Sequence, residues 1–261
     1  MTSIWTTQQP SIRVQWGTRS FDATGVIAAL RESLKVLALC GPPFAGPWTL
    51  LDPSSQDADG SRVDELADSD VELLIERGVA RNHDGQPFPQ DGYGVTLVSM
   101  PTEGVGASLR LHVGASVTRH IVNEVAVSLR ALEPGASVDL RDSFGKHQAE
   151  VVGRLVELWH ADLAQVSVRD ANRSQKRFAT LIGLTNFFRG DHSSLLSSID
   201  LPGSAKAVVA DGGTWLTVDV GSDDLVTAVA GIVATADAIE DAGGLAGGAS
   251  SKPRADVRPE A

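Results

Sequence analysis

Three consecutive stretches of the chain alternate apolar and polar residues with a period of two, and this pattern constrains the fold more than any other. The stretches cover residues 93–99, 107–113 and 123–129, and turn residues separate the first two. Such alternation places one face of each strand against a core and the other in water, as in antiparallel sheets. The pattern predicts a three-stranded antiparallel meander in the middle of the chain.

The segments before and after this meander predict helices mixed with further strands. Apolar residues at helical spacing, with caps and Gly or Pro stops, predict helices at residues 22–39, 69–78, 144–159 and 224–243. Short alternating or apolar runs predict strands at residues 11–16, 48–51, 164–168, 177–188, 206–210 and 215–220. Strands follow strands too often for a parallel βαβ array, so the predicted fold class is α+β, with antiparallel sheets and packed helices.

One domain is expected between a short arm and a tail. Residues 1–10 form the arm, and residues 11–243 contain every expected helix and strand. Residues 244–261 are Gly, Ser, Pro and charged residues with little to bury, so this tail is expected to be disordered. A break at residues 133–143 divides the domain into two possible halves, whose similarity the residues leave open: 11–142 and 143–243.

Composition excludes several classes of protein. The chain has 261 residues, of which 42% are hydrophobic and 21% charged, and this balance is typical of globular rather than disordered proteins. No apolar run reaches the ~18–20 residues that cross a bilayer, and the N-terminus lacks the pattern of a secretory signal. We therefore expect a cytoplasmic protein without a membrane partner. Its one cysteine, Cys40, cannot form an internal disulfide and is expected to be buried.

Negative charge is concentrated in one part of the chain. The formal net charge is -11, which argues against direct binding of nucleic acid, and residues 52–103 hold 3 basic and 12 acidic side chains. Three interpretations are open: a solvated loop, a docking surface for a basic protein, or a calcium loop opened by Asp57 and Asp59. The candidate partner-binding residues of this segment are Asp57, Asp59, Asp64, Glu65, Asp68, Asp70, Glu72 and Glu76.

Sequence motifs of common enzymes are absent. The chain has no G-x-S-x-G elbow, P-loop, dinucleotide-binding loop, HExxH or zinc-deaminase pattern. The close pairs of histidine and carboxylate are His160 with Asp162 and Asp191 with His192. These four residues are the best candidates if the chain is an enzyme, although ordinary surface histidines explain them more simply. We expect no catalysis, no cofactor and no bound metal.

Spaced aromatic residues and glycines carry a resemblance to a known family. They are Trp16-Gly17, Phe44 and Trp48 before Leu51-Asp52, Gly92-Tyr93, Leu158-Trp159 with Asp162, residues 184–188, and Leu201-Pro202 ahead of Gly212-Gly213-Thr214-Trp215. Over residues 11–243 this series resembles immunity protein family 52 of bacterial polymorphic toxin systems. The pattern residues are expected to be structural, with tryptophans that fill the core: Trp16, Trp48, Gly92, Tyr93, Trp159, Asp162 and Trp215.

The resemblance implies a non-catalytic protein that binds and neutralises a cognate toxin, often a nuclease with a restriction-endonuclease-like fold. A nuclease presents a basic cleft to phosphates, so an acidic surface on its inhibitor would speed association. We therefore expect residues 57–76 to contribute to docking. The alternatives are an enzyme of unrecognised type and a structural or secretion adaptor, and the oligomeric state is open.

Overall fold

The computed structural model describes most of the chain and forms one continuous sheet. The described residues are 3–6, 9–20, 22–51, 58–102, 104–117, 123–131, 137–175, 181–220 and 224–245. Most of the expected tail, residues 246–261, lies outside them.

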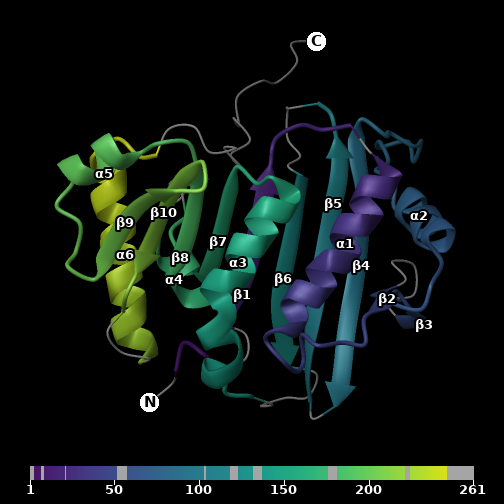
Figure 1. Ribbon diagram of the computed structural model, residues 1–261, viewed down its shortest axis with the longest axis horizontal. Coiled ribbons are helices and arrows are strands. Elements are labelled where there is room, and N and C mark those ends of the chain that lie inside the picture. The colour runs from purple at the N-terminus through teal and green to yellow at the C-terminus, as the bar shows by residue number, and fades with distance from the viewer. Residues whose placement is uncertain are drawn as a thin grey trace.

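Ten strands form a single sheet in the order β3-β2-β4-β5-β6-β1-β7-β8-β10-β9, and every neighbouring pair is antiparallel (Figure 1). The strands are β1 (Pro10–Trp16), β2 (Thr49–Leu51), β3 (Ala58–Arg62), β4 (Asp91–Thr102), β5 (Val105–Ala115), β6 (Asn123–Ala131), β7 (Leu163–Val168), β8 (Thr185–Arg189), β9 (Ala205–Ala210) and β10 (Gly213–Val218). β1, the first of these strands in the sequence, therefore lies in the middle of the sheet. It pairs with β6, which precedes residues 133–143, and with β7, which follows them.

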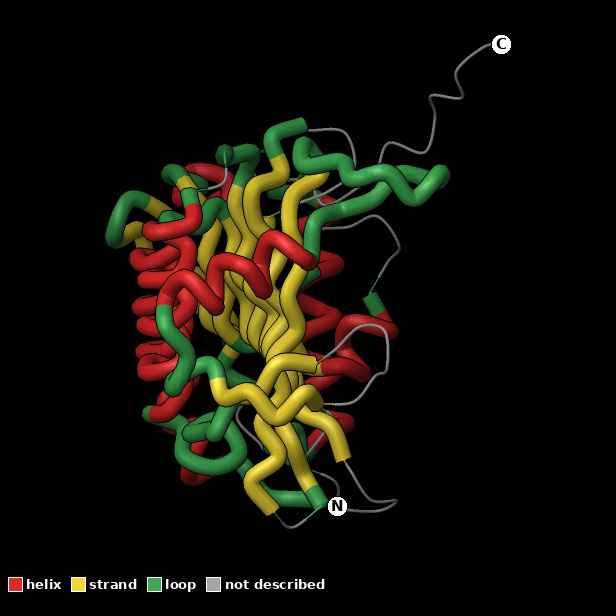
Figure 2. Tube along the Cα trace, turned by 90° about the vertical axis from the view of Figure 1, so that its right-hand side faces the viewer, coloured by secondary structure: helices red, strands yellow, loops and turns green. Residues whose placement is uncertain are grey.

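Helices lie on both sides of this sheet (Figure 2). They are α1 (Ala23–Ala38), α2 (Asp68–Arg77), α3 (Lys146–Trp159), α4 (Arg169–Ser174), α5 (Ser193–Ser198) and α6 (Leu225–Asp241), with a π-helical turn at Arg141–Gly145 before α3. α1 and α3 pack against each other, and α3 also packs on β1 and β7. α2 packs against β4 and α1, whereas α4 and α6 contact each other and pack on β7 and β10 respectively.

The main core lies between the sheet and the layer of α1 and α3. Ile12, Val14 and Trp16 alternate along β1 toward this layer and are almost fully buried. Trp16 stacks on Trp159, with 4.8 Å between ring centroids, and the Trp159 Nε1–H donates to Ser33 Oγ at 2.9 Å. The two tryptophans therefore join the central strand to both helices.

The opposite face of the sheet is open in the meander. Cross-strand register places Thr96, Arg110, Ala126 and Arg13 in one row on this face. Glu124, in the neighbouring row, forms ion pairs with Arg110 and with Arg13, the latter at 3.6 Å. Its charge is thus met within the sheet. By contrast, every residue of β7 is buried, because α3 covers one face there and α4 the other.

The predicted fold class is confirmed. The expected meander, the hairpin near residues 206–220 and the main helices are present, and Asp224 caps α6 by accepting from the Thr227 N–H at 3.0 Å. The helix expected at 69–78 is present as α2, which begins one residue earlier, at Asp68, with Ala67 in its cap position. The strand expected at 177–188 is confirmed only at its end: β8 begins at Thr185, residues 181–184 are outside any strand, and residues 177–180 lie outside the described part of the chain.

Candidate protein-binding surface

Helix α2 presents an exposed leucine between acidic side chains. Val71 and Ile75, which are 2% and 1% exposed, fix one side of the helix against the core. Leu73 is 47% exposed, and Asp70 and Glu76 lie three residues before and after it. Residues three apart are neighbours on a helix surface, so these two carboxylates flank Leu73 on the outer side of α2. An apolar side chain rimmed by charge is typical of interaction sites.

Arg31 of α1 holds the segment that leads into α2. Its guanidinium donates to the carbonyl oxygens of Val63 and Leu66, at 3.1 and 2.6 Å, and its Nε donates to Asp68 at 3.0 Å. A planar guanidinium with several N–H donors suits three acceptors at once. The start of α2 is therefore tied to α1 by one side chain.

Gly78 holds the other end of α2. The Gly94 N–H of β4 donates to the carbonyl oxygen of Gly78 at 2.8 Å, and a Cβ atom on Gly78 would overlap the Gly94 carbonyl oxygen. The helix can approach the strand this closely only because the residue has no side chain. With both ends held, α2 is a rigid platform for its exposed residues.

The acidic residues predicted to bind a partner fall into distinct groups. Asp64 and Glu65 pair with Arg62 at 2.6 and 2.7 Å, and the hydrogen bond to Asp64 raises the pKa of Arg62. Asp68 pairs with Arg31 at 2.9 Å.

In the part of the chain that the structure describes, Asp70, Glu72 and Glu76 form no ion pair. Asp59 lies in β3 with its side chain outside the description, and Asp57 lies outside the described residues. Within the described part of the acidic segment, the carboxylates without an ion pair are therefore on α2. The ion pairs of Arg62 and Arg31 with the preceding carboxylates were not predicted from the sequence.

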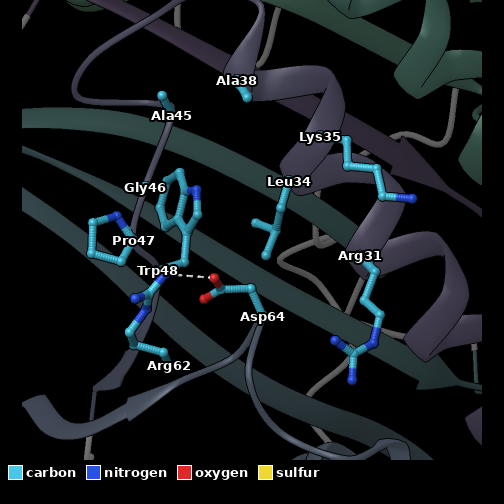
Figure 3. A pocket seen from close by; sticks show the side chains of 10 residues that line it. All are labelled: Arg31, Leu34, Lys35, Ala38, Ala45, Gly46, Pro47, Trp48, Arg62 and Asp64. Carbon is cyan, nitrogen blue, oxygen red and sulfur yellow. Dashed lines mark hydrogen bonds and ion pairs between the residues drawn. The ribbon is translucent and has the colours of Figure 1, made fainter.

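A groove of about 510 Å³ lies between α1 and the segments around Trp48 and Arg62 (Figure 3). Its base is apolar, with Leu34 of α1 and the ring of Trp48, whereas Lys35 contributes charge at the rim. Residues lining the groove are Arg31, Leu34, Lys35, Ala38, Ala45, Gly46, Pro47, Trp48, Arg62 and Asp64. Arg31 and Arg62 thus line the groove and also pair with carboxylates of the acidic segment. Sequence reasoning missed the groove because its sides come from separate segments.

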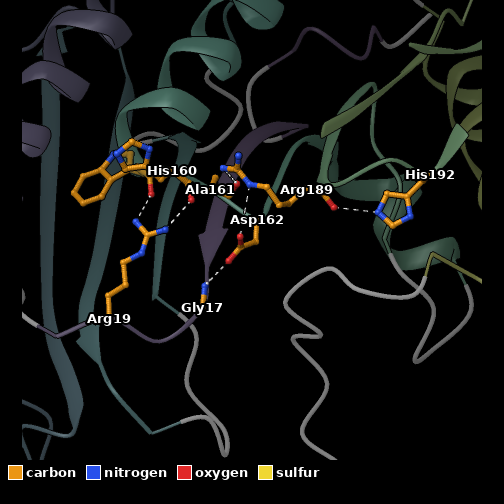
Figure 4. Close-up of polar contacts among 8 residues, drawn as sticks. Gly17, Arg19, His160, Ala161, Asp162, Arg189 and His192 are labelled. Atoms are coloured by element: carbon orange, nitrogen blue, oxygen red, sulfur yellow. Dashed lines mark hydrogen bonds and ion pairs between the residues drawn. The ribbon is translucent and has the colours of Figure 1, made fainter. Parts of the chain in front are cut away.

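The residues proposed for an enzyme have structural contacts instead of a catalytic arrangement (Figure 4). Asp162 accepts from the Gly17 N–H at 2.7 Å and lies 3.8 Å from Arg189 Nε, which joins the ends of β1, β7 and β8. His160 caps α3 in a left-handed conformation, with φ of 45°, and its carbonyl oxygen accepts from Arg19 at 2.9 Å.

The second proposed pair also stabilises a turn. His192 Nε2 lies 3.2 Å from the carbonyl oxygen of Arg189, and its ring meets Phe188 edge-on. Hydrogen bonds from Ser193 hold the pKa of Asp191 below its ordinary value. Arg189 lies between the two pairs, because its side chain is near Asp162 and its carbonyl oxygen contacts His192.

The residues of the family-like pattern have structural positions. Trp16, Trp48 and Trp159 are buried, and Trp215 packs on Phe187 with 4.9 Å between ring centroids. Gly92 has φ of 89°, a conformation that favours glycine, and Tyr93 is partly buried against the core. The tryptophans thus fill the core as expected, and the exposed apolar residue beside the acidic side chains is Leu73.

Two searches of the described residues were negative. They contain no group of three or more His, Cys, Asp or Glu side chains placed to hold a metal ion. Among the described helices, none has the length and apolar character that crossing a membrane requires.

Comparisons with known proteins give only distant similarity in structure. No family model matches the chain, that of immunity protein family 52 included, and no curated protein matches it. Among solved structures, the Pseudomonas aeruginosa T6SS protein PA0821 is similar with a TM-score of 0.46 and 7% sequence identity, over 84% of this chain and 68% of that chain. The functional argument therefore depends on this chain's own residues.

Proposed function

We propose that this chain is a non-catalytic immunity protein that binds and neutralises a cognate bacterial toxin in the cytoplasm, the toxin being of nuclease type. The observation that carries the proposal is Leu73, 47% exposed between Asp70 and Glu76 on a helix held at both ends. A rigid apolar side chain surrounded by unneutralised carboxylates suits a partner with a basic surface and a small apolar pocket. The spaced aromatic residues and glycines of the sequence resemble an immunity family, but no family model matches the chain, so the proposal depends on the surface of α2.

The first experiment is co-expression with the product of the gene adjacent to this one. We expect cells to survive that product only when this chain is present, and the two proteins to purify together. Toxin activity should fall linearly with added chain and reach zero near equal amounts, because inhibition by binding is stoichiometric. Loss of toxin activity at far lower ratios would show turnover and contradict the non-catalytic part of the proposal.

Charge reversal tests the role of α2. The double variant Asp70→Lys/Glu76→Lys should associate at least tenfold more slowly with the toxin and lose most of its salt dependence, because electrostatic steering acts on the association rate. The matched control is Glu157→Lys/Asp200→Lys, which changes the net charge equally at two exposed carboxylates elsewhere. Equal slowing in both variants would show that only total charge matters and would remove α2 from the interface.

Truncation of the leucine tests the apolar part of the surface. We expect Leu73→Ala to raise the dissociation rate about tenfold, since a central apolar side chain contributes more than about 1 kcal/mol. Val226→Ala, at a residue that is 78% exposed on α6, should leave the rate unchanged. A stable complex that leaves the toxin active would favour the adaptor function instead.

A further inference from the structure

The sheet ends in a strand with an exposed outer edge. β9 is the last strand in the sheet order and pairs only with β10 among the described strands (Figure 1). Four consecutive residues, Lys206 to Val209, are exposed, with Val208 at 60% and Val209 at 47%. Valines on both faces of an edge strand are unusual, because proteins normally protect such edges from pairing with another chain.

The hairpin geometry shows which backbone groups point outward. Asp211 and Gly212 form a two-residue turn with φ of 56° and 73°, as in a type I′ hairpin, so Ala210 and Gly213 form the closing hydrogen-bonded pair. Alternation then turns the N–H and C=O groups of Val208 and Lys206 toward β10. The bond from the Asp219 N–H to the Ser204 carbonyl oxygen, at 2.6 Å, fits this alternation. The backbone groups of Ala207 and Val209 therefore face outward.

We propose that β9 pairs antiparallel with β9 of a second copy of this chain, about a two-fold axis at Val208. In this register Ala207 faces Val209 of the second copy and exchanges two backbone hydrogen bonds with it, and the symmetric pair repeats the exchange. Val208 then faces its own counterpart, which covers the most exposed valine of the strand. The two ten-stranded sheets become one.

Charge on the strand supports a second copy as the occupant. The same register places Lys206 opposite Ala210 of the second copy, whereas Asp211 lies opposite Ala205 and so on the other face of the ladder. Lys206 never faces Lys206, which avoids the repulsion of like charges across a ladder. The Lys206 side chain is exposed and forms no ion pair within the described residues. A six-residue ladder buries less area than the ~800 Å² per partner of a standard interface. The dimer should therefore be weak, and the fraction of dimer should rise with protein concentration.

Cysteine crosslinking tests the register. Val208→Cys should form an intermolecular disulfide under mild oxidation, because facing residues of a non-hydrogen-bonded pair lie ~4.5 Å apart at Cα, within disulfide range. Val209→Cys is the matched control: it is similarly exposed, but its counterpart lies two residues further along the ladder, so it should crosslink at least tenfold less. The natural Cys40 is fully buried and does not compete.

Sedimentation equilibrium tests the dimer itself. The wild-type chain should show a monomer–dimer equilibrium, and Val208→Asp should be monomeric at every concentration because two carboxylates would face each other. Met100→Asp, at another exposed apolar residue, should dimerise normally. Circular dichroism checks that the variants are folded. A wild-type chain that stays monomeric, or equal crosslinking of the two cysteine variants, would overturn the proposal.

Discussion

Replacement of Arg31 by lysine should destabilise the protein by about 2–3 kcal/mol, far more than loss of the Arg31–Asp68 ion pair. Arg31 donates to two backbone carbonyl oxygens besides Asp68. A hydrogen bond that involves a charged group contributes about 1.5–3 kcal/mol. Lysine retains the charge but cannot reach all three acceptors. The Arg31 side chain is 26% exposed, so water replaces part of what the lost hydrogen bonds contribute. The expected cost is therefore near the lower end of the range for two such hydrogen bonds.

Neutralisation of the partner carboxylate provides the comparison. The Asp68 side chain is 76% exposed, and exposed ion pairs contribute only about 0–1 kcal/mol. Asp68→Asn should therefore cost less than about 0.5 kcal/mol.

The measurement is urea unfolding followed by tryptophan fluorescence, with hydrogen exchange of residues 63–77 as a local probe. Arg31→Lys should accelerate exchange there, and Asp68→Asn should not. Equal costs for the two variants would refute the reasoning, because they would make the ion pair, rather than the backbone contacts, the source of stability.

Three further predictions concern stability. Gly78→Ala should destabilise the protein by more than about 2 kcal/mol in the same urea assay, because the new Cβ would overlap a carbonyl oxygen of β4. Gly153 of α3 has open space around it, so Gly153→Ala should stabilise the protein by up to about 1 kcal/mol. Asp224→Ala should destabilise the protein at pH 7 through loss of the α6 cap. Hydrogen bonds from Thr227 lower the pKa of Asp224 in the folded state. The contribution of Asp224 is therefore present above its unfolded pKa of ~4 and is lost as the pH falls through the lowered pKa, where thermal melts of the two proteins should converge. Burial raises the pKa of Cys40 to about 12, so iodoacetamide should modify the native protein at pH 8 far more slowly than the urea-unfolded chain; equal rates would contradict this.

Periodicity in the sequence predicted the elements with strong patterns. The alternation at residues 93–99, 107–113 and 123–129 predicted β4, β5 and β6, and the short runs at 206–210 and 215–220 predicted β9 and β10. The short elements β3, α4 and α5 were not predicted, because five or six residues are too few to show the helical or the strand periodicity of apolar residues. The position of β1 between β6 and β7 depends on packing between distant segments, which no local pattern records.

The candidate surface was predicted only in part. The acidic segment was visible in the sequence, and Arg62 lies close enough to Asp64 and Glu65 for their pairing to have been inferred. Arg31 is 37 residues from Asp68, and that contact depends on how α1 packs. Exposure of Leu73 was equally hidden, since it depends on which side of α2 faces the core.

The central place of β1 affects how the protein emerges from the ribosome. Its partners are β6 and β7, so its second edge stays unpaired until about 150 more residues have been synthesised. At the usual rates of translation this takes on the order of 10 s. Pairing over such long separations is also intrinsically slow. For roughly that time after β1 leaves the ribosome, the nascent chain cannot complete the middle of its sheet.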